Sequence, residues 1–241
     1  FSLDTLMISD QLSLALTLDD SALFSNYIIA QENKLAVAAL KSLAEPDRGR
    51  VEDFIYLWGE GSPGLTHLLQ ALCHELADAG RTALYLPVAE LIQLSPEILE
   101  GVENYAVVCL DGIDKIAGEP AWEAALFTAF NRLRAEGSEL VIAAKKAPSA
   151  LPWGLLDLGS RMRSGLTLRL NQLGDRDKRA LLQQRALARG VQLDGAVADF
   201  IMLRAPRDTP ALLALFDRLD KASLKTKRPI TIPFVKQILD W

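Results

Sequence analysis

The segment 59–66 constrains the fold most, because it has the G-x-x-x-x-G-x-[ST] spacing of a phosphate-binding loop. An apolar run over 54–58 precedes it, and a helical pattern begins at His67. Backbone amides at such a strand–loop–helix junction hold phosphate oxygens, and the hydroxyl of Thr66 reaches a magnesium ion. Leu65 stands where the motif has lysine, so the charge that meets the β- and γ-phosphates is missing. We therefore expect a nucleotide binder that is poor at hydrolysis.

A second nucleotide element is the apolar run 107–110, which ends in Asp111. Placed at the carboxyl edge of a parallel sheet beside the loop, this carboxylate can hold magnesium. Taken alone, an aspartate at the end of a strand more often serves in a turn or as a helix cap. Asp114 is expected to cap a turn, with orientation of water as the alternative role. Gly112 has no side chain to orient water, and the run 140–144, expected between the two nucleotide elements, ends in alanine.

Apolar runs alternate with helical patterns along the first 170 residues, which predicts an α/β fold with a mainly parallel sheet between helices. Beyond residue 171 only helical patterns follow, and Asp175 and Asp194 are expected to cap the first two. We predict an N-terminal peptide (1–20), an α/β domain (21–170) and an all-α domain (171–241). The expected strands are 53–58, 82–87, 105–110, 139–144 and 166–170, and the expected helices are 33–43, 66–79, 88–100, 120–136, 156–162, 175–189, 194–204, 209–224 and 232–239.

Composition indicates a soluble cytoplasmic protein without a membrane partner. No apolar run approaches the roughly 20 residues that span a bilayer, and no basic stretch followed by an apolar run opens the chain. The two cysteines, Cys73 and Cys109, are expected to be buried in a reducing compartment. Residues 171–241 carry 13 basic and 8 acidic side chains, whereas residues 1–170 carry 13 and 23. Ordinary surface charge and a C-terminal part that faces phosphates or an acidic partner are both compatible with this asymmetry.

Short motifs follow one another in a specific order: Asn-Tyr-Ile-Ile at 26–29, Thr-His-Leu-Leu at 66–69, Leu-Asp at 110–111, Ser-Arg at 160–161 and Ile-Pro-Phe-Val at 232–235. In this order the whole chain resembles the AAA+ ATPase module of the bacterial DnaA family, and within it the Hda regulators that inactivate DnaA. The resemblance implies an AAA+ P-loop module, with a parallel five-stranded sheet between helices, followed by a small all-α lid.

The resemblance also implies a nucleotide site, with ADP as the expected ligand and Mg²⁺ held by Thr66 and Asp111. Pro210 stands where the lid contributes a sensor arginine, so either Arg207 replaces it or that contact is lost. The nucleotide-binding residues implied are Tyr27, Ile28, Ile29, Gly59, Gly61, Ser62, Pro63, Gly64, Leu65, Thr66, His67, Asp111 and Arg207.

Two further sites follow from the resemblance. Arg161 matches the arginine finger that acts on a neighbour's γ-phosphate, with Arg163 as a weaker candidate; without the resemblance, Arg161 would be expected to pair with a carboxylate on its own surface. The N-terminal segment is similar to the sliding-clamp binding motif of these regulators, although its alternating leucines would also suit an edge strand. The clamp-binding residues are Gln11, Leu12, Ser13, Leu14 and Leu16.

The implied function is negative regulation of replication initiation, in which the clamp of DNA polymerase III recruits the chain and Arg161 promotes hydrolysis of DnaA-bound ATP. DNA would be met mostly through the clamp, and a self-dimer that hides Arg161 is an open alternative. A second class is an independent ATPase of the helicase-loader type, which Leu65 and Gly112 disfavour. A third is a DNA-binding initiator, disfavoured because no helix-turn-helix pattern follows the lid.

Overall fold

The computed structural model describes residues 18–45 and 53–241, which divide into two compact units. The described residues up to Leu170 form an α/β unit, apart from two short segments, Ile28–Ala30 and Gly61–Pro63. These two segments group with Asn171–Trp241 in a second, helical unit. The sequence prediction had assigned both segments to the α/β domain.

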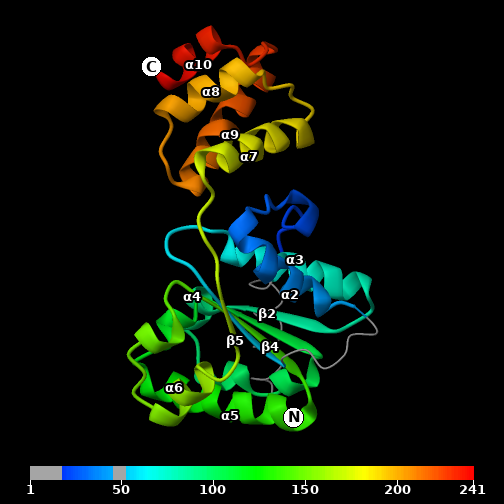
Figure 1. Ribbon diagram of the computed structural model, residues 1–241, viewed down its shortest axis with the longest axis vertical. Helices are drawn as coiled ribbons and strands as arrows, with labels where there is room; N and C mark the ends of the chain where they lie inside the picture. Colours follow the sequence, from blue (N-terminus) through cyan, green and yellow to red (C-terminus); the bar gives the residue numbers. More distant parts are fainter. Residues whose placement is uncertain (1–17, 46–52) are drawn as a thin grey trace. The chain divides into compact units, whose positions relative to one another are not determined.

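The α/β unit is built on five parallel strands in the order β2-β3-β4-β1-β5 (Figure 1). The strand that leads into the phosphate loop, β1, therefore lies beside β4, and β4 separates it from the strand that ends in Asp111. This arrangement confirms the predicted parallel sheet and the predicted place of the run 140–144. The strands are β1 (Phe54–Trp58), β2 (Ala83–Pro87), β3 (Val107–Asp111), β4 (Glu139–Ala144) and β5 (Leu166–Arg169).

Helices cover both faces of this sheet, which explains why its strands are continuous apolar runs. Successive side chains point to opposite faces, so Ile55 and Leu57 pack with α2 and α3, whereas Phe54 and Tyr56 pack on the side of α5 and α6 (Figure 1). The helices of this unit are α2 (Lys34–Ser42), α3 (Leu65–Asp78), α4 (Val88–Leu91), α5 (Pro120–Glu136) and α6 (Leu156–Met162).

The predicted helix over 88–100 is wrong. The α-helix ends after Leu91, and a separate 3₁₀ turn, Pro96–Leu99, follows Ser95. Proline lacks an N–H and disfavours helical angles at the residue before it, so the first helix cannot continue through this segment. The other 3₁₀ turns of the described residues are Phe24–Asn26, Gln31–Asn33, Val102–Asn104, Ile113–Lys115 and Pro148–Ala150.

The second unit has its own apolar core, in which Leu182, Phe216 and Phe234 are fully buried or nearly so. Asp194 caps its helix as predicted, because its carboxylate accepts the N–H of Ala196 at 2.7 Å. Asp175 does not act as a cap: it is the first helical residue, after Gly174. No helix of the described part is long and apolar enough to cross a membrane. The helices are α7 (Asp175–Ala188), α8 (Gly195–Arg204), α9 (Thr209–Thr226) and α10 (Ile232–Leu239).

Candidate functional site

The phosphate loop turns sharply from β1 into α3 at Gly64. This glycine has φ 94° and directly precedes the helix. A Cβ there would lie 2.7 Å from a ring carbon of Tyr27, so glycine is required for both backbone angle and space. The first intrahelical bond runs from the Leu68 N–H to the Gly64 carbonyl, which leaves the N–H groups of residues 65–67 ahead of it, without an acceptor inside the helix. Such amides suit an anion.

Two predicted magnesium ligands meet at the carboxyl ends of the strands. The hydroxyl of Thr66, on the first turn of α3, donates to Oδ2 of Asp111 at 2.6 Å. The same oxygen accepts the hydroxyl of Tyr85, on β2, at 2.9 Å. Burial and the negative charge of Asp111 raise the pKa of Tyr85, so it stays a donor at neutral pH. Tyr85 was missed in the sequence, where its only signal is a tyrosine inside an apolar strand.

The loop after Asp111 is fastened to the end of β4. Oxygens of the Asp114 carboxylate accept the N–H of Lys145 at 2.8 and 3.0 Å and that of Lys146 at 3.2 Å. The predicted capping of its own turn by Asp114 is wrong, because the 3₁₀ turn Ile113–Lys115 has no side-chain cap. The Asp114 oxygens are instead committed to the backbone that follows β4. Because β4 ends in Ala144, that strand contributes no polar side chain at this edge.

Tyr27 and His67 lie beside the loop, on its α3 side. Their rings are 5.6 Å apart, and the Tyr27 hydroxyl accepts a hydrogen bond from Asn33 at 3.4 Å. Burial raises the pKa of Tyr27 to about 12, with the Asn33 bond opposing part of that rise. Of the other predicted residues, Gly59 donates its N–H to the Ala144 carbonyl at 3.1 Å, and Ile28, Ile29, Gly61, Ser62 and Pro63 belong to the second unit.

One face of α3 fastens the end of the predicted N-terminal peptide and the residues that follow it. Nε2 of His67 forms a hydrogen bond with the backbone carbonyl of Leu23 at 2.9 Å. Nε2 of His74 forms one with the backbone carbonyl of Asp19 at 3.1 Å. Between them, Gln70 accepts the N–H of Asp19 at 3.1 Å. Both histidines therefore bind the backbone of the segment around Asp19 and Leu23. The predicted clamp-binding residues, Gln11, Leu12, Ser13, Leu14 and Leu16, lie outside the described residues.

Arg161 lies in the last turn of α6. Its guanidinium carbon is 6.0 Å from the centre of the Phe130 ring, and it forms no ion pair with a carboxylate of the described residues. The pairing on its own surface that the sequence left open therefore has no counterpart in residues 18–45 and 53–241. Arg163, one residue beyond the helix, is exposed.

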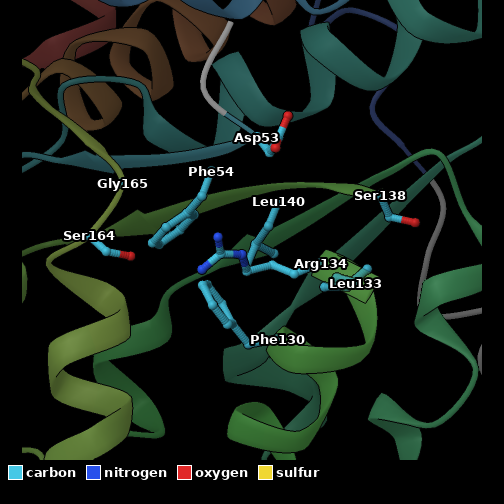
Figure 2. A pocket seen from close by; sticks show the side chains of 9 residues that line it. All are labelled: Asp53, Phe54, Phe130, Leu133, Arg134, Ser138, Leu140, Ser164 and Gly165. Atoms are coloured by element: carbon cyan, nitrogen blue, oxygen red, sulfur yellow. The ribbon is translucent and has the colours of Figure 1, made fainter. Parts of the chain in front are cut away.

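A pocket of about 160 Å³ lies near this arginine, at the amino ends of β1 and β4 (Figure 2). Figure 2 shows the Arg134 side chain reaching toward the Phe54 and Phe130 rings, and its guanidinium carbon is 6.0 Å from the centre of the Phe130 ring. Because the strands are parallel, this is the edge opposite Asp111 and the phosphate loop, and the pocket is not the nucleotide site. It is lined by Asp53, Phe54, Phe130, Leu133, Arg134, Ser138, Leu140, Ser164 and Gly165.

The predicted lid residue Arg207 is paired within its own unit. Its guanidinium is 3.3 Å from the Asp175 carboxylate, and the two side chains are 87% and 65% exposed. A pair this exposed is worth at most about 1 kcal/mol, so an incoming phosphate could replace it. Lys178 donates to the Arg207 carbonyl at 2.5 Å and holds the backbone there.

The model of the bacterial DnaA ATPase domain matches residues 18–171. The chain belongs to the bacterial DnaA ATPase family. The model of the Hda lid domain matches residues 175–239, so the chain is an Hda-type, DnaA-homologous AAA+ module, as the motif order indicated. Family membership gives it a function related to replication initiation.

Known proteins that are similar to this DnaA-family chain match it over most of its length. An uncharacterized protein of Haemophilus influenzae is 40% identical over 234 residues, which cover 97% of this chain and all of that protein. Domain III of DnaA from Thermotoga maritima has a TM-score of 0.80 at 18% identity, covering 93% of this chain and 98% of that one. AMPPCP-bound DnaA from Aquifex aeolicus has a TM-score of 0.70 at 19% identity, and the match covers 87% of this chain and 71% of that one. The RuvB Holliday junction branch migration motor of Thermotoga maritima has a TM-score of 0.67 at 20% identity, and the match covers 88% of this chain and 69% of that one. These structures confirm the AAA+ fold.

Proposed function

We propose that this chain is a nucleotide-bound regulator that the sliding clamp recruits and that stimulates hydrolysis of ATP held by DnaA. The observation that carries the proposal is a contrast between two charged positions. Its own phosphate loop has Leu65 in place of the lysine, whereas Arg161, in the last turn of α6, forms no ion pair with a described carboxylate. The phosphate loop thus lacks its own cation, whereas Arg161 has a charge to offer another nucleotide.

The loop supports binding of a nucleoside diphosphate. The amides of residues 65–67 and the Thr66–Asp111 pair are the groups that would hold phosphate oxygens and Mg²⁺, and none of them needs a lysine. Bound Mg²⁺ would neutralise negative charge on the phosphates. Without lysine, a charged phosphate contact worth about 1.5–3 kcal/mol is lost, which weakens triphosphate binding most. ADP is therefore the proposed resident ligand, with Tyr27, Ile28 and Ile29 at its base and Arg207 as the candidate lid contact.

Arg161 is proposed to act in trans. When water attacks the γ-phosphorus of ATP on DnaA, the bond to the β–γ bridging oxygen breaks and negative charge shifts onto the departing ADP. A guanidinium placed there stabilises this charge, and such arginines are worth about 10³–10⁵ in rate. Arginine suits the task because its fork of N–H donors is planar and always charged.

The N-terminal peptide is proposed to bind the clamp through Gln11, Leu14 and Leu16, with Leu12 and Ser13 between them. Two hydrogen bonds fasten Asp19, a few residues later, to His74 and Gln70 on α3. A clamp-bound peptide would therefore be tied closely to the α/β unit rather than through a long linker. Close tethering raises the effective concentration of Arg161 near clamp-loaded DNA.

One observation favours the second candidate, an independent ATPase: Thr66 and Asp111 are both present and in contact. Against it stand Leu65 and Gly112, and the end of β4 in Ala144. An intrinsic ATPase predicts turnover by the isolated protein that Asp111→Asn abolishes.

The test is hydrolysis of ATP preloaded on DnaA, with the purified chain, clamp and DNA present together or omitted one at a time. We expect stimulation only when the clamp is loaded on DNA, and expect Gln11→Ala to shift the half-maximal concentration upward without changing the plateau. Stimulation that needs no clamp would contradict recruitment. Turnover by the chain alone, without DnaA, would favour the independent ATPase.

A further inference from the structure

Glu123, on α5, is an almost fully buried carboxylate that holds two loops. It is 1% exposed, and no described lysine or arginine forms an ion pair with it. Its oxygens accept three backbone N–H groups: that of Gly118 at 2.7 Å, that of Gly154 at 3.1 Å and that of Leu155 at 2.6 Å. Burying a charge is expensive unless such bonds satisfy it, so the carboxylate and the two loops fix each other.

The second of these loops leads into the helix that carries Arg161. Leu155 is the residue that immediately precedes α6, and its own side chain makes no capping bond. The Glu123 carboxylate therefore fixes the N-cap residue of α6 and the residue before it. Trp153, in the same loop, packs on Gly159, where a Cβ would lie 3.1 Å from the indole ring. The start of α6 is thus fixed by both a buried anion and a packed ring.

The other end of α6 meets the same helix α5, seven residues further along. Phe130 is 2% exposed, and the Arg161 guanidinium lies over its ring at 6.0 Å. The ring is itself fixed by an edge-to-face contact with Phe54 of β1, at 5.4 Å between centres and 83° between planes. A cation–π contact at this distance orients a guanidinium without neutralising its charge. This contact favours one direction for the Arg161 side chain and leaves its charge available to another anion.

We infer that α5 aims the arginine finger from two points, with Glu123 and Phe130 as positioning residues for Arg161. This inference rests on the proposed trans-acting role of Arg161. Neither residue is required to touch the nucleotide on DnaA. Their effect is on the maximal stimulated rate, because a misplacement of about 1 Å at a reacting phosphate costs up to about 100-fold.

The experiment measures the plateau rate of ATP hydrolysis on DnaA at saturating concentrations of this chain, with clamp-loaded DNA. We expect Glu123→Gln to lower the plateau by about 10- to 100-fold, and Phe130→Leu, which keeps an apolar side chain, by about 10-fold. The half-maximal concentration and the affinity for ADP are expected to stay unchanged. Glu136→Gln, an exposed position of α5, and Arg134→Ala, which loses the other guanidinium over Phe130, are matched controls expected to keep the wild-type plateau.

A double-variant cycle separates positioning from general damage. In an Arg161→Ala background, Glu123→Gln and Phe130→Leu are expected to have no further effect on the plateau. If Arg161→Ala alone keeps full stimulation, the proposed function fails. If Arg161→Ala abolishes stimulation while both positioning variants keep the wild-type plateau, this inference is overturned. Should Glu123→Gln fail to fold, Phe130→Leu decides, and a parallel loss of ADP affinity in that variant would also overturn the inference.

Discussion

The hydroxyl of Thr66 donates to the carboxylate of Asp111 at 2.6 Å, although the two residues are 45 positions apart in the chain. The contact exists because the strands leading to both positions are parallel and β4 alone separates them in the sheet. It brings a hydroxyl and a carboxylate to the edge where parallel α/β sheets bind their ligands. The proposed nucleotide site follows from this pair, and the missing lysine limits what the site can do.

Restoring the lysine should strengthen triphosphate binding. Leu65→Lys is expected to tighten ATP binding by roughly 10- to 100-fold, because it adds a charge-assisted contact to the β- and γ-phosphates. ADP affinity should change less. Titration with a fluorescent ATP analogue measures the effect. Leu35→Lys adds the same charge at a leucine on α2 that is 68% exposed and serves as the control. Equal affinities for Leu65→Lys and wild type would contradict the proposed path of the phosphates.

Removing the charge of Asp111 should remove the effect of magnesium. Asp111→Asn keeps an oxygen that can accept from Thr66 and Tyr85, so the fold is expected to persist. Wild-type protein should bind ADP more tightly with Mg²⁺ than with a chelator, and the variant should show no difference. Calorimetry in both buffers tests this, with Asp114→Asn as a nearby variant that should leave the magnesium effect intact. An undiminished magnesium effect in Asp111→Asn would place the ion elsewhere.

Alanine at Gly64 should cost more than alanine at Gly80. Both glycines have positive φ, 94° and 71°, where an L-residue costs about 1–2 kcal/mol. Gly80 has open space around its Cβ position, whereas Gly64 meets the Tyr27 ring at 2.7 Å. Urea unfolding of the two variants gives the difference, which combines the Tyr27 contact with the larger φ at Gly64. Equal losses of unfolding free energy would mean that the Tyr27 ring moves away from the new Cβ without destabilising the protein.

The stabilising effect of Glu123 should fade in acid. Burial alone would raise the pKa of this carboxyl, but the three backbone N–H donors outweigh it and the pKa is lowered. A lowered folded pKa stabilises the protein above the unfolded value of about 4.3, and this contribution is lost as pH falls through the folded pKa. Glu123→Gln should lower the unfolding free energy by about 1–3 kcal/mol at pH 7, because a buried acceptor is replaced by a donor.

The check on Glu123 is urea unfolding between pH 7 and pH 3. The gap between wild type and Glu123→Gln should be widest at neutral pH and should narrow as pH falls below about 5. Glu136→Gln, on the exposed side of the same helix, should show no such narrowing. A gap that stays constant with pH would show that the carboxylate charge is not the stabilising feature.

The sequence was most informative where a residue's role depends on its neighbours in the chain, although the break at Pro96 in the predicted helix 88–100 was missed. The alternation of apolar runs predicted the strands, and the loop spacing with a strand ending in Asp111 predicted the pair at their edge. Roles set by distant segments were not accessible. Glu123 reads in sequence as an ordinary charged position on a helix, and only the folding of two loops around it shows that it is buried. Tyr85 donates to Asp111 on the neighbouring strand, and Phe130 of α5 contacts Arg161 of α6. The spacing of residues along the chain does not predict either contact.

Arg161 is proposed to supply a charge to ATP held by another protein. The most direct test is single-turnover hydrolysis of ATP on DnaA, with clamp-loaded DNA and saturating wild type, Arg161→Ala, Arg161→Lys or Arg134→Ala. We predict that Arg161→Ala falls to the unstimulated rate and that Arg161→Lys recovers little of it, because an ammonium lacks the planar fork. Arg134→Ala should equal wild type. Full stimulation by Arg161→Ala would show that this guanidinium does not act on the ATP of DnaA.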